Sequence, residues 1–270
     1  MVIRSLLQDA GIPRLDAEIL LAFTLGVPRE KLLFLYNETA AEETAAAFSA
    51  LCQKRKTGCP VAYLLGEREF FSLPFYVNEN TLIPRPDTEI LVEWAIGKAE
   101  GKRVLDLCCG TGCIGIATAR NAAVSSLTLA DISPGALSVA QKNADRHCTP
   151  AAFLQLDILK DSILGQFDLI LSNPPYIETD VIPTLEKDVC HFEPHLALDG
   201  GADGLDFYPV IIEKAFSALS PDGWLGLEIG YTQGKAVSEM MEPFFDNVRV
   251  LPDLAGNPRA VVGHKNTPVG

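Results

Sequence analysis

The sequence predicts an α/β protein, in which a mostly parallel sheet carries helices on both faces behind a small all-helical region. Two observations support this. From about residue 87 onward, apolar runs typical of buried strands alternate with segments of helical periodicity. Before about residue 66, only the helical period occurs. We therefore expect a helical domain over residues 1–68, a hairpin linker over 69–84 and a larger domain over 85–270.

Composition and charge narrow the class of protein. The chain has 270 residues, of which 48% are hydrophobic, enough for a sizeable core. It has no apolar run as long as a membrane span and no apolar signal segment at its start, so we expect a cytoplasmic protein without a membrane partner. The formal charge of −13 argues against direct binding of nucleic acid. The seven cysteines favour free thiols, and we expect a monomer.

The N-terminal region is expected to form several helices. Gly26 is placed to end the first long helix. Thr39 and Glu42 have the spacing of a capping box for a later helix, whose basic last turn at residues 54–56 complements the helix dipole. Such a basic cluster is more typical of a solvated helix end than of a binding patch. The residues that the first long helix should bury are Leu15, Ile19, Ala22 and Phe23.

The linker is rich in aromatic residues, which predicts two short strands with turns at Pro74 and at residues 78–80. Beyond it, Pro86 fits the first turn of a helix, and Asp87 suits the dipole of that helix. Two interpretations of this proline-rich segment remain open. It is a simple helix start, or Arg85 and the rigid prolines shape the wall of a ligand cleft.

Strands and helices then alternate along the larger domain. The last two strands, joined by residues 253–258, favour an antiparallel hairpin that would make a seven-stranded sheet mixed. The predicted strands are 103–108, 126–131, 152–157, 167–173, 223–229, 246–251 and 259–263. The predicted helices are 87–99, 113–121, 134–146, 207–219 and 232–243.

The fourth of these strands carries the most functional information. It runs into Asn173-Pro174-Pro175-Tyr176 at its carboxyl end, the edge where open α/β sheets bind ligands. The prolines stiffen the turn, and its carbonyl groups together with the Asn173 side chain form acceptors suited to a planar NH2 group. Tyr176 offers a flat face to such a group. By itself, the tetrapeptide fits an ordinary strand-ending turn about equally well.

This tetrapeptide resembles the catalytic motif of methyltransferases that use S-adenosyl-L-methionine and act on amide or exocyclic amino nitrogens. An amide nitrogen is a poor nucleophile because its lone pair is delocalised. Hydrogen bonds from its NH2 group to Asn173 and to the Pro174 carbonyl would hold it and stabilise the positive charge that develops. The closing antiparallel hairpin is also typical of the methyltransferase version of the Rossmann-like fold. The expected catalytic and substrate-binding residues are Asn173, Pro174, Pro175 and Tyr176.

A glycine-rich turn at residues 108–112 follows the first strand of the larger domain and opens a helix. Alone, such a turn fits a dinucleotide, a mononucleotide or no ligand. Asp131 ends the next strand, about 20 residues on, where a carboxylate can accept from both ribose hydroxyls. Because no second nucleotide site is visible, an adenosyl and a methionine moiety fit better than a dinucleotide. The expected cofactor residues are Cys108, Cys109, Gly110, Thr111, Gly112, Asp131, Asp157, Ile158 and Asn173.

A metal site is not expected. Cys108, Cys109 and Cys113 lack the spacing of paired zinc ligands, and small buried side chains explain them better. His191 and His195 are four residues apart, but Pro194 would break a helix between them, which favours loop residues. No serine–histidine–aspartate set is evident either.

Over nearly its whole length the chain resembles the PrmC/HemK family, the peptide chain release factor N5-glutamine methyltransferases. The matching segments are 84–89, 106–112, 172–176, 192–194, 197–205 and 253–259. The resemblance implies methylation of the side-chain amide of the glutamine in the Gly-Gly-Gln motif of class I release factors, with S-adenosyl-L-homocysteine as product. It also implies that the N-terminal domain binds the release factor. One departure is the Cys108-Cys109 pair, where family members commonly have glycine or threonine.

Three rival functions remain open at this stage. A DNA adenine N6-methyltransferase shares the tetrapeptide and would flip a base into it, but the acidic charge and the lack of a basic recognition domain oppose this. Glutamine methylation of a ribosomal protein would use the same chemistry on another partner. A non-catalytic adapter would bind the cofactor without transfer. In all three, the long connection over residues 177–206 is expected to be a lid or a disordered loop.

Overall fold

The computed structural model describes residues 1–266 and divides the chain into two compact units. The first unit comprises Met1–Glu67 together with Glu186–Phe192, and the second comprises Arg68–Leu185 and the described chain from Glu193 onward. Among the helices of the described residues, none has both the length and the apolar character needed to span a bilayer. Each unit has its own hydrophobic core.

The first unit is helical. Its elements are α1 (Ile3–Gln8), α2 (Arg14–Leu25), the 3₁₀ turn η1 (Arg29–Lys31), α3 (Leu32–Leu35), α4 (Glu42–Lys56), α5 (Val61–Leu65) and α9 (Lys187–Phe192). Gly26 ends α2 in the left-handed conformation, as predicted, with φ of 65°. The predicted capping box is wrong, because α4 begins after Ala41 and no side chain caps it.

The predicted buried face of α2 is also wrong, apart from Ala22. Leu15 and Phe23 are 53% and 54% exposed, whereas Leu20 and Leu21 are fully buried. The helix is apolar on two adjoining faces, so periodicity alone does not decide which face enters the core. Leu20 and Leu21 pack in one cluster with side chains of α1 and α4, among them Phe48.

The second unit contains a seven-stranded sheet and, apart from Glu67 at its start, a two-stranded sheet of β1 (Glu67–Phe70) and β2 (Leu73–Tyr76). The predicted turn at Pro74 is wrong, because Pro74 lies inside β2 and the turn falls at Phe71 and Ser72, which have φ of 50° and 59°. The strands of the large sheet are β3 (Arg103–Leu107), β4 (Ser126–Asp131), β5 (Ala152–Gln155), β6 (Phe167–Ser172), β7 (Leu219–Glu228), β8 (Phe245–Pro252) and β9 (Pro258–Lys265).

The large sheet has the order β5-β4-β3-β6-β7-β9-β8. Its first five strands are parallel, and β9 pairs antiparallel with both β7 and β8, which confirms the predicted mixed sheet. Because β3 and β6 are neighbours, the segments that follow Leu107 and Ser172 emerge side by side at the carboxyl edge. Those two segments are the glycine turn and the Asn-Pro-Pro-Tyr corner.

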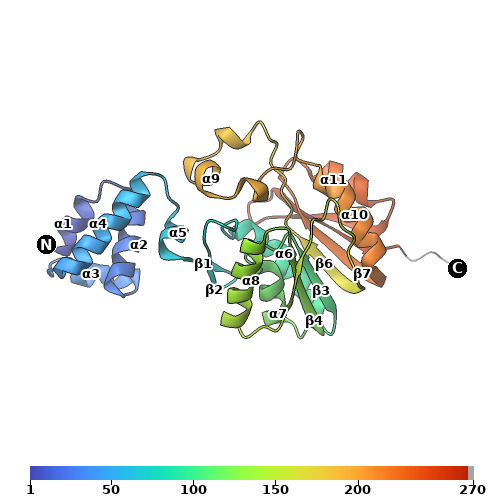
Figure 1. The fold of residues 1–270 in the computed structure, drawn as a ribbon, viewed down its shortest axis with the longest axis horizontal. Coiled ribbons are helices and arrows are strands. Elements are labelled where there is room, and N and C mark those ends of the chain that lie inside the picture. Colours follow the sequence, from blue (N-terminus) through green and yellow to red (C-terminus); the bar gives the residue numbers. More distant parts are fainter. Residues whose placement is uncertain (267–270) are drawn as a thin grey trace. The chain divides into compact units, whose positions relative to one another are not determined.

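Helices cover both faces of this sheet (Figure 1). The 3₁₀ turn η2 (Pro86–Thr88) leads into α6 (Glu89–Ala99), which packs on one face with α7 (Cys113–Asn121) and α8 (Pro134–Arg146). On the other face lie α10 (Phe207–Ala218) and α11 (Gly234–Met241). The predicted helices are therefore present. Those at 113–121 and 134–146 match the observed bounds, and the ends of the other three differ from the observed ends by at most two residues.

The connection after β6 is folded rather than irregular throughout. It contains η3 (Ile182–Thr184), α9 and η4 (His195–Ala197), so His191 and His195 lie in short helical turns instead of loops. Ile177 exchanges main-chain hydrogen bonds with Leu198 and Gly200, at 2.9 and 2.8 Å. These contacts return the chain to the end of β6.

Candidate active site

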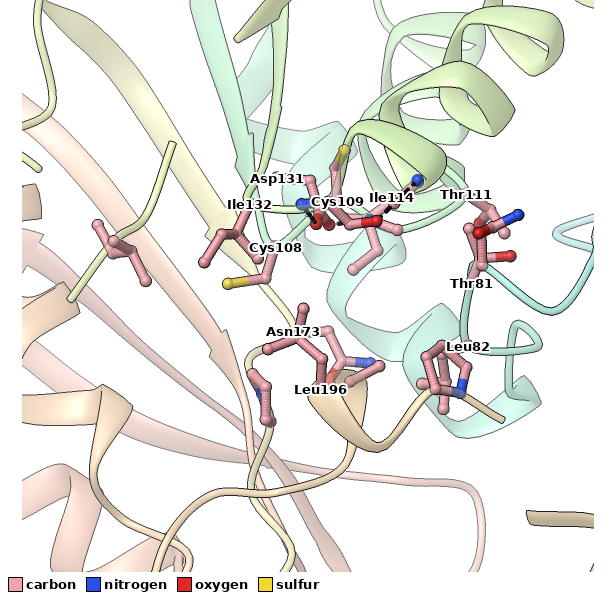
Figure 2. Close-up of a pocket in the computed structure, with 18 of the residues that line it drawn as sticks. Thr81, Leu82, Cys108, Cys109, Thr111, Ile114, Asp131, Ile132, Asn173 and Leu196 are labelled. Carbon is pink, nitrogen blue, oxygen red and sulfur yellow. Dashed lines mark hydrogen bonds between the residues drawn. The ribbon is translucent and has the colours of Figure 1, made fainter. Parts of the chain in front are cut away.

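A cavity of about 340 Å³ opens at the carboxyl ends of the parallel strands (Figure 2). It lies where β3, β4 and β6 end and where the chain continues beyond β5. The cavity brings together all but one of the residues predicted to bind a cofactor. Those that line it are Cys108, Cys109, Gly110, Thr111, Asp131, Asp157, Ile158 and Asn173.

The turn after β3 has an unusual backbone. Cys108, Gly110 and Gly112 have φ of 56°, 53° and 75°, a region that glycine adopts freely and cysteine does not. A side chain on Gly110 would meet no atom within 4 Å, so this position leaves space beside the backbone. Gly112 differs, because a side chain there would crowd Leu129 and Ile116 at 3.0 and 3.1 Å. Gly112 therefore serves close helix–strand packing and does not line the cavity.

Asp131 ends β4 and is held by two main-chain N–H groups. Gly110 donates to its Oδ2 at 2.8 Å and Ser133 donates to its Oδ1 at 2.9 Å. The bond from Gly110 ties the carboxyl group to the glycine turn, and each oxygen keeps a second lone pair. Burial raises the pKa of Asp131 above its ordinary value, and the hydrogen bonds partly oppose this.

The sequence analysis predicts that Asp157 ends a strand. This prediction is wrong, because β5 stops at Gln155. Asp157 lies in the following loop, where its carboxylate pairs with Lys160 at 2.7 Å, and the hydrogen bond from Lys160 lowers the pKa of Asp157. Lys214 of α10 binds the main chain of the same loop. Its ammonium group donates to the carbonyls of Ile158 and Asp161 at 2.6 and 2.7 Å.

The Asn-Pro-Pro-Tyr corner is anchored at its base. Ser172 donates to the Leu107 carbonyl at 2.8 Å, which joins the ends of β6 and β3. The Asn173 carboxamide makes no hydrogen bond to any residue in the described part of the chain, and Figure 2 shows it facing the cavity near Cys108 and Leu196. Pro175 also lines the cavity.

The other two corner residues point elsewhere. Among the described residues that line the cavity, neither Pro174 nor Tyr176 is present. The Tyr176 hydroxyl donates to Glu228 at the end of β7, at 3.3 Å, and the Tyr176 carbonyl accepts from Gln233 at 3.1 Å. Their predicted contacts with substrate stay predictions.

A partly buried ion pair supports the cavity wall. Glu193 pairs with Arg85 and accepts from the main-chain N–H of Ile83 at 3.0 Å, and its carboxylate is almost fully buried. Pro84 and Arg85 line the cavity, and Pro86 opens the turn η2 that leads into α6, so the structure supports both interpretations of this segment. Leu196, from the turn after Glu193, also lines the cavity, and Figure 2 shows it beside Asn173.

Sequence reasoning missed several residues of this site. The rim includes exposed apolar side chains that follow the predicted acids, notably Ile132 and Leu159, at 38% and 45% exposure. Ile132 directly follows the strand-end carboxylate of Asp131, and this position could have indicated it. Asn143 in the middle of α8 gave no such indication, although it is fully buried and bonded to the Thr111 carbonyl at 3.0 Å.

The cysteines near the turn behave as buried thiols. Burial raises the pKa of both Cys108 and Cys113 to about 12, so neither is ionised near neutral pH. Within residues 1–266, no group of three or more histidine, cysteine or acidic side chains is arranged to hold a metal ion.

Comparisons with known proteins agree over both units. The family described as PrmC N-terminal domain matches residues 2–66, and the family described as Methyltransferase small domain matches residues 86–191. The release factor glutamine methyltransferase of Koribacter versatilis is 40% identical over 265 residues, which cover 96% of this chain and 94% of that protein. The chain belongs to the release factor glutamine methyltransferase family.

Other members of the family align over similar lengths. The release factor glutamine methyltransferase of Salmonella typhimurium is 38% identical over 95% of this chain and 94% of its own length. That of Geobacter sulfurreducens is 39% identical over 88% of this chain and 84% of its own. Release factor glutamine methyltransferases thus share both units of this chain.

Solved structures support the fold of the second unit. A methyltransferase from Pyrococcus furiosus superposes with a TM-score of 0.56 at 18% identity and covers 73% of this chain and 91% of its own. A protein complexed with SAH gives a TM-score of 0.51 at 16% identity, over 72% of this chain and 54% of its own. At these identities the likeness establishes the Rossmann-like methyltransferase fold of this family member and no more.

Proposed function

We propose that this chain methylates the side-chain amide nitrogen of the glutamine in the Gly-Gly-Gln motif of class I peptide chain release factors, with S-adenosyl-L-methionine as methyl donor. The observation that carries the proposal is the unpaired Asn173 carboxamide, which faces a cavity built on the glycine turn and Asp131. Family membership supplies the class of substrate.

The cavity suits the proposed cofactor. Gly110 leaves open space where a methionine moiety can approach the backbone. Asp131 keeps free lone pairs for two ribose hydroxyls, and the apolar side chains of Ile132 and Ile158 offer faces to an adenine ring. When bound, S-adenosyl-L-methionine supplies an electrophilic methyl group on a positively charged sulfur.

The corner would then act on the substrate amide. The Asn173 side-chain carbonyl and the Pro174 carbonyl accept hydrogen bonds from the NH2 group and orient its lone pair. The same two acceptors stabilise the positive charge that grows on the nitrogen. No strong base is needed before transfer, because the nitrogen becomes acidic only as it becomes cationic, and its proton then leaves to water or to a carbonyl.

The two remaining parts of the chain have supporting roles in this proposal. Residues 1–68 select the release factor, residues 69–84 link them to the catalytic domain, and residues 85–270 carry the chemistry. The segment 177–206 excludes water from the reacting groups. The protein acts as a monomer, without direct contact to nucleic acid.

Mass spectrometry tests this function. Purified protein, labelled S-adenosyl-L-methionine and an unmethylated class I release factor should yield one labelled methyl group on the glutamine of the Gly-Gly-Gln peptide. Duplex DNA and ribosomal proteins in parallel reactions should remain unlabelled. Label on either of these and none on the release factor would overturn the proposed substrate, and no label anywhere would leave only a cofactor-binding adapter.

Asn173→Ala tests the role of the corner in the same assay. Turnover should fall by about 10²- to 10³-fold, the usual effect of removing one such hydrogen-bonding group, while cofactor affinity by calorimetry stays within a few-fold. Asn121→Ala is the matched control, because Asn121 bonds only within α7, to the Ala117 carbonyl at 2.8 Å. Wild-type turnover by Asn173→Ala would show that the corner does not hold the amide.

A further inference from the structure

A buried glutamate, Glu228, lies next to the Asn-Pro-Pro-Tyr corner and contacts Tyr176. Glu228 is the last residue of β7, which pairs with β6 so that Leu227 lies opposite Ser172. The next residues along the two strands are therefore Glu228 and Asn173. Glu228 is only 2% exposed, and it is not among the described residues that line the cavity. A buried carboxyl group at this place needs a reason, because burial of charge is costly.

The two carboxyl oxygens of Glu228 have different surroundings. Oε1 accepts from the Tyr176 hydroxyl at 3.3 Å. Oε2 is buried and has no hydrogen-bond partner within the described residues. The Glu228 main-chain carbonyl accepts from the Tyr208 hydroxyl at 3.0 Å, which fixes the end of β7 itself. Among the described residues, the side-chain hydrogen bond of Glu228 within ordinary distance is therefore the one from Tyr176, and it ties Glu228 to the corner.

We propose that Glu228 is a positioning residue for methyl transfer: its ionised carboxylate holds the Tyr176 side chain, and through Tyr176 the corner that presents Asn173 and Pro174. This inference rests on the proposed function, since it assigns a role within that reaction. A charged acceptor binds a phenol hydroxyl about twice as strongly as a neutral one. Protonation of Glu228 therefore loosens the corner.

Burial and the surrounding groups place the protonation of Glu228 near neutral pH. Burial raises the pKa of Glu228 to about 7, and Asp87 of η2 adds to the rise. The Thr88 hydroxyl of η2, Arg259 of β9 and the Tyr176 hydroxyl lower it. Burial and the charge of Glu228 in turn raise the pKa of Tyr176 and of Tyr208, so both phenols stay protonated donors throughout the relevant range.

A second buried side chain holds the corner by its main chain and provides a comparison. Gln233 donates to the carbonyls of Tyr176 and Gly204 at 3.1 and 3.0 Å, and accepts from the Gly230 N–H at 2.9 Å. Gln233 does not titrate. Loss of Gln233 should therefore slow transfer without altering the dependence of the rate on pH.

The first test is the pH profile of kcat on the release factor at saturating cofactor. Between pH 6 and pH 8, wild-type kcat should rise about tenfold, as expected for one group of pKa near 7. E228Q should be flat across this range and about tenfold below wild type at pH 8. Q233A should be slower but should keep the rise. Y176F should resemble E228Q, and the double variant Y176F/E228Q should lose no more than either single variant.

The use of saturating cofactor separates Glu228 from a second carboxyl group. Burial also raises the pKa of Asp106, below the glycine turn, to about 7. Asp106 accepts from the Gly115 N–H at 2.8 Å, so its titration should affect cofactor affinity rather than kcat. A rise in kcat that persists in E228Q, or E228Q with wild-type kcat at pH 8, would overturn the inference.

A second test does not depend on activity. In protein labelled with ¹³C at the tyrosine ζ carbon, the Tyr176 resonance should shift with a midpoint near pH 7 in wild type and should not shift in E228Q. Absence of the wild-type shift would overturn the inference even if methyl transfer is found. If the shift is present but no methyl reaches the release factor, the contact stands and the proposed function fails instead.

Discussion

Asn143→Ala should destabilise the second unit and weaken its cofactor site together. Asn143 lies in the middle of α8 with a fully buried side chain. Its Nδ2 donates to the carbonyls of Tyr76 and Thr111, both at 3.0 Å, and its Oδ1 accepts from the Tyr76 N–H at 2.7 Å. One side chain thus joins β2, α8 and the glycine turn.

The magnitude follows from these three bonds. Alanine leaves three main-chain groups without a partner, and each such buried group costs about 1–3 kcal/mol. We therefore expect the free energy of unfolding to fall by at least about 3 kcal/mol. Because one of the three groups belongs to the glycine turn, cofactor affinity should also fall by about tenfold, which corresponds to about 1.4 kcal/mol.

Urea titration followed by tryptophan fluorescence isolates this effect. The chain has 2 tryptophans, Trp94 and Trp224, and both lie in the second unit. Asn121→Ala, at the exposed end of α7, should change the free energy of unfolding by less than about 0.5 kcal/mol. Equal effects of the two substitutions would refute the reasoning, because they would show that the three buried bonds contribute nothing beyond a surface contact.

Three further predictions follow from single contacts. Asp131→Ala should weaken cofactor binding by about 10- to 100-fold in calorimetry, since up to two hydrogen bonds to a charged acceptor are lost; unchanged affinity would place the ribose elsewhere. Arg103 holds the pKa of Asp168 well below its usual range, so this pair stabilises the fold above about pH 4, the ordinary aspartate pKa, and loses its effect as pH falls further. Asp168→Asn should therefore be less stable than wild type at pH 7, with a gap in urea midpoint that narrows below pH 4; a constant gap would contradict the linkage. Cys108→Gly should leave the free energy of unfolding unchanged or raise it, because glycine adopts the left-handed backbone conformation of this position without strain. Cys109→Gly should lower the free energy of unfolding, because Cys109 is buried and its φ is not positive. The opposite order in urea titrations would count against strain at Cys108.

The sequence was sufficient for the features that depend on local pattern. Alternation of apolar strands and amphipathic helices predicted the order of elements in the second unit. The corner could be located because a strand that ends in Asn-Pro-Pro-Tyr must deliver Asn173 to the carboxyl edge of a parallel sheet. Asp131 followed from the same rule. Asn173 and Asp131 both lie at or next to strand ends, and the apolar pattern of the sequence itself defines where those strands end.

Features that depend on distant partners could not be predicted. Glu228 and Gln233 lie 52 and 57 residues beyond Tyr176, and nothing in their own segments indicates a buried partner. The pairing of Arg85 with Glu193 spans 108 residues. Phe71 and Ser72 form a turn with positive φ at residues that rarely adopt it, so the hairpin was placed at the proline instead.

The central claim is that the corner after β6 holds the substrate amide beside the cofactor. A crystal structure with S-adenosyl-L-homocysteine and a glutamine peptide tests it most directly. We expect the product to lie against Gly110 and Asp131, with the glutamine NH2 group within hydrogen-bonding distance of the Asn173 side-chain carbonyl and the Pro174 carbonyl. A glutamine that binds away from Asn173, or a cofactor outside this cavity, would contradict it.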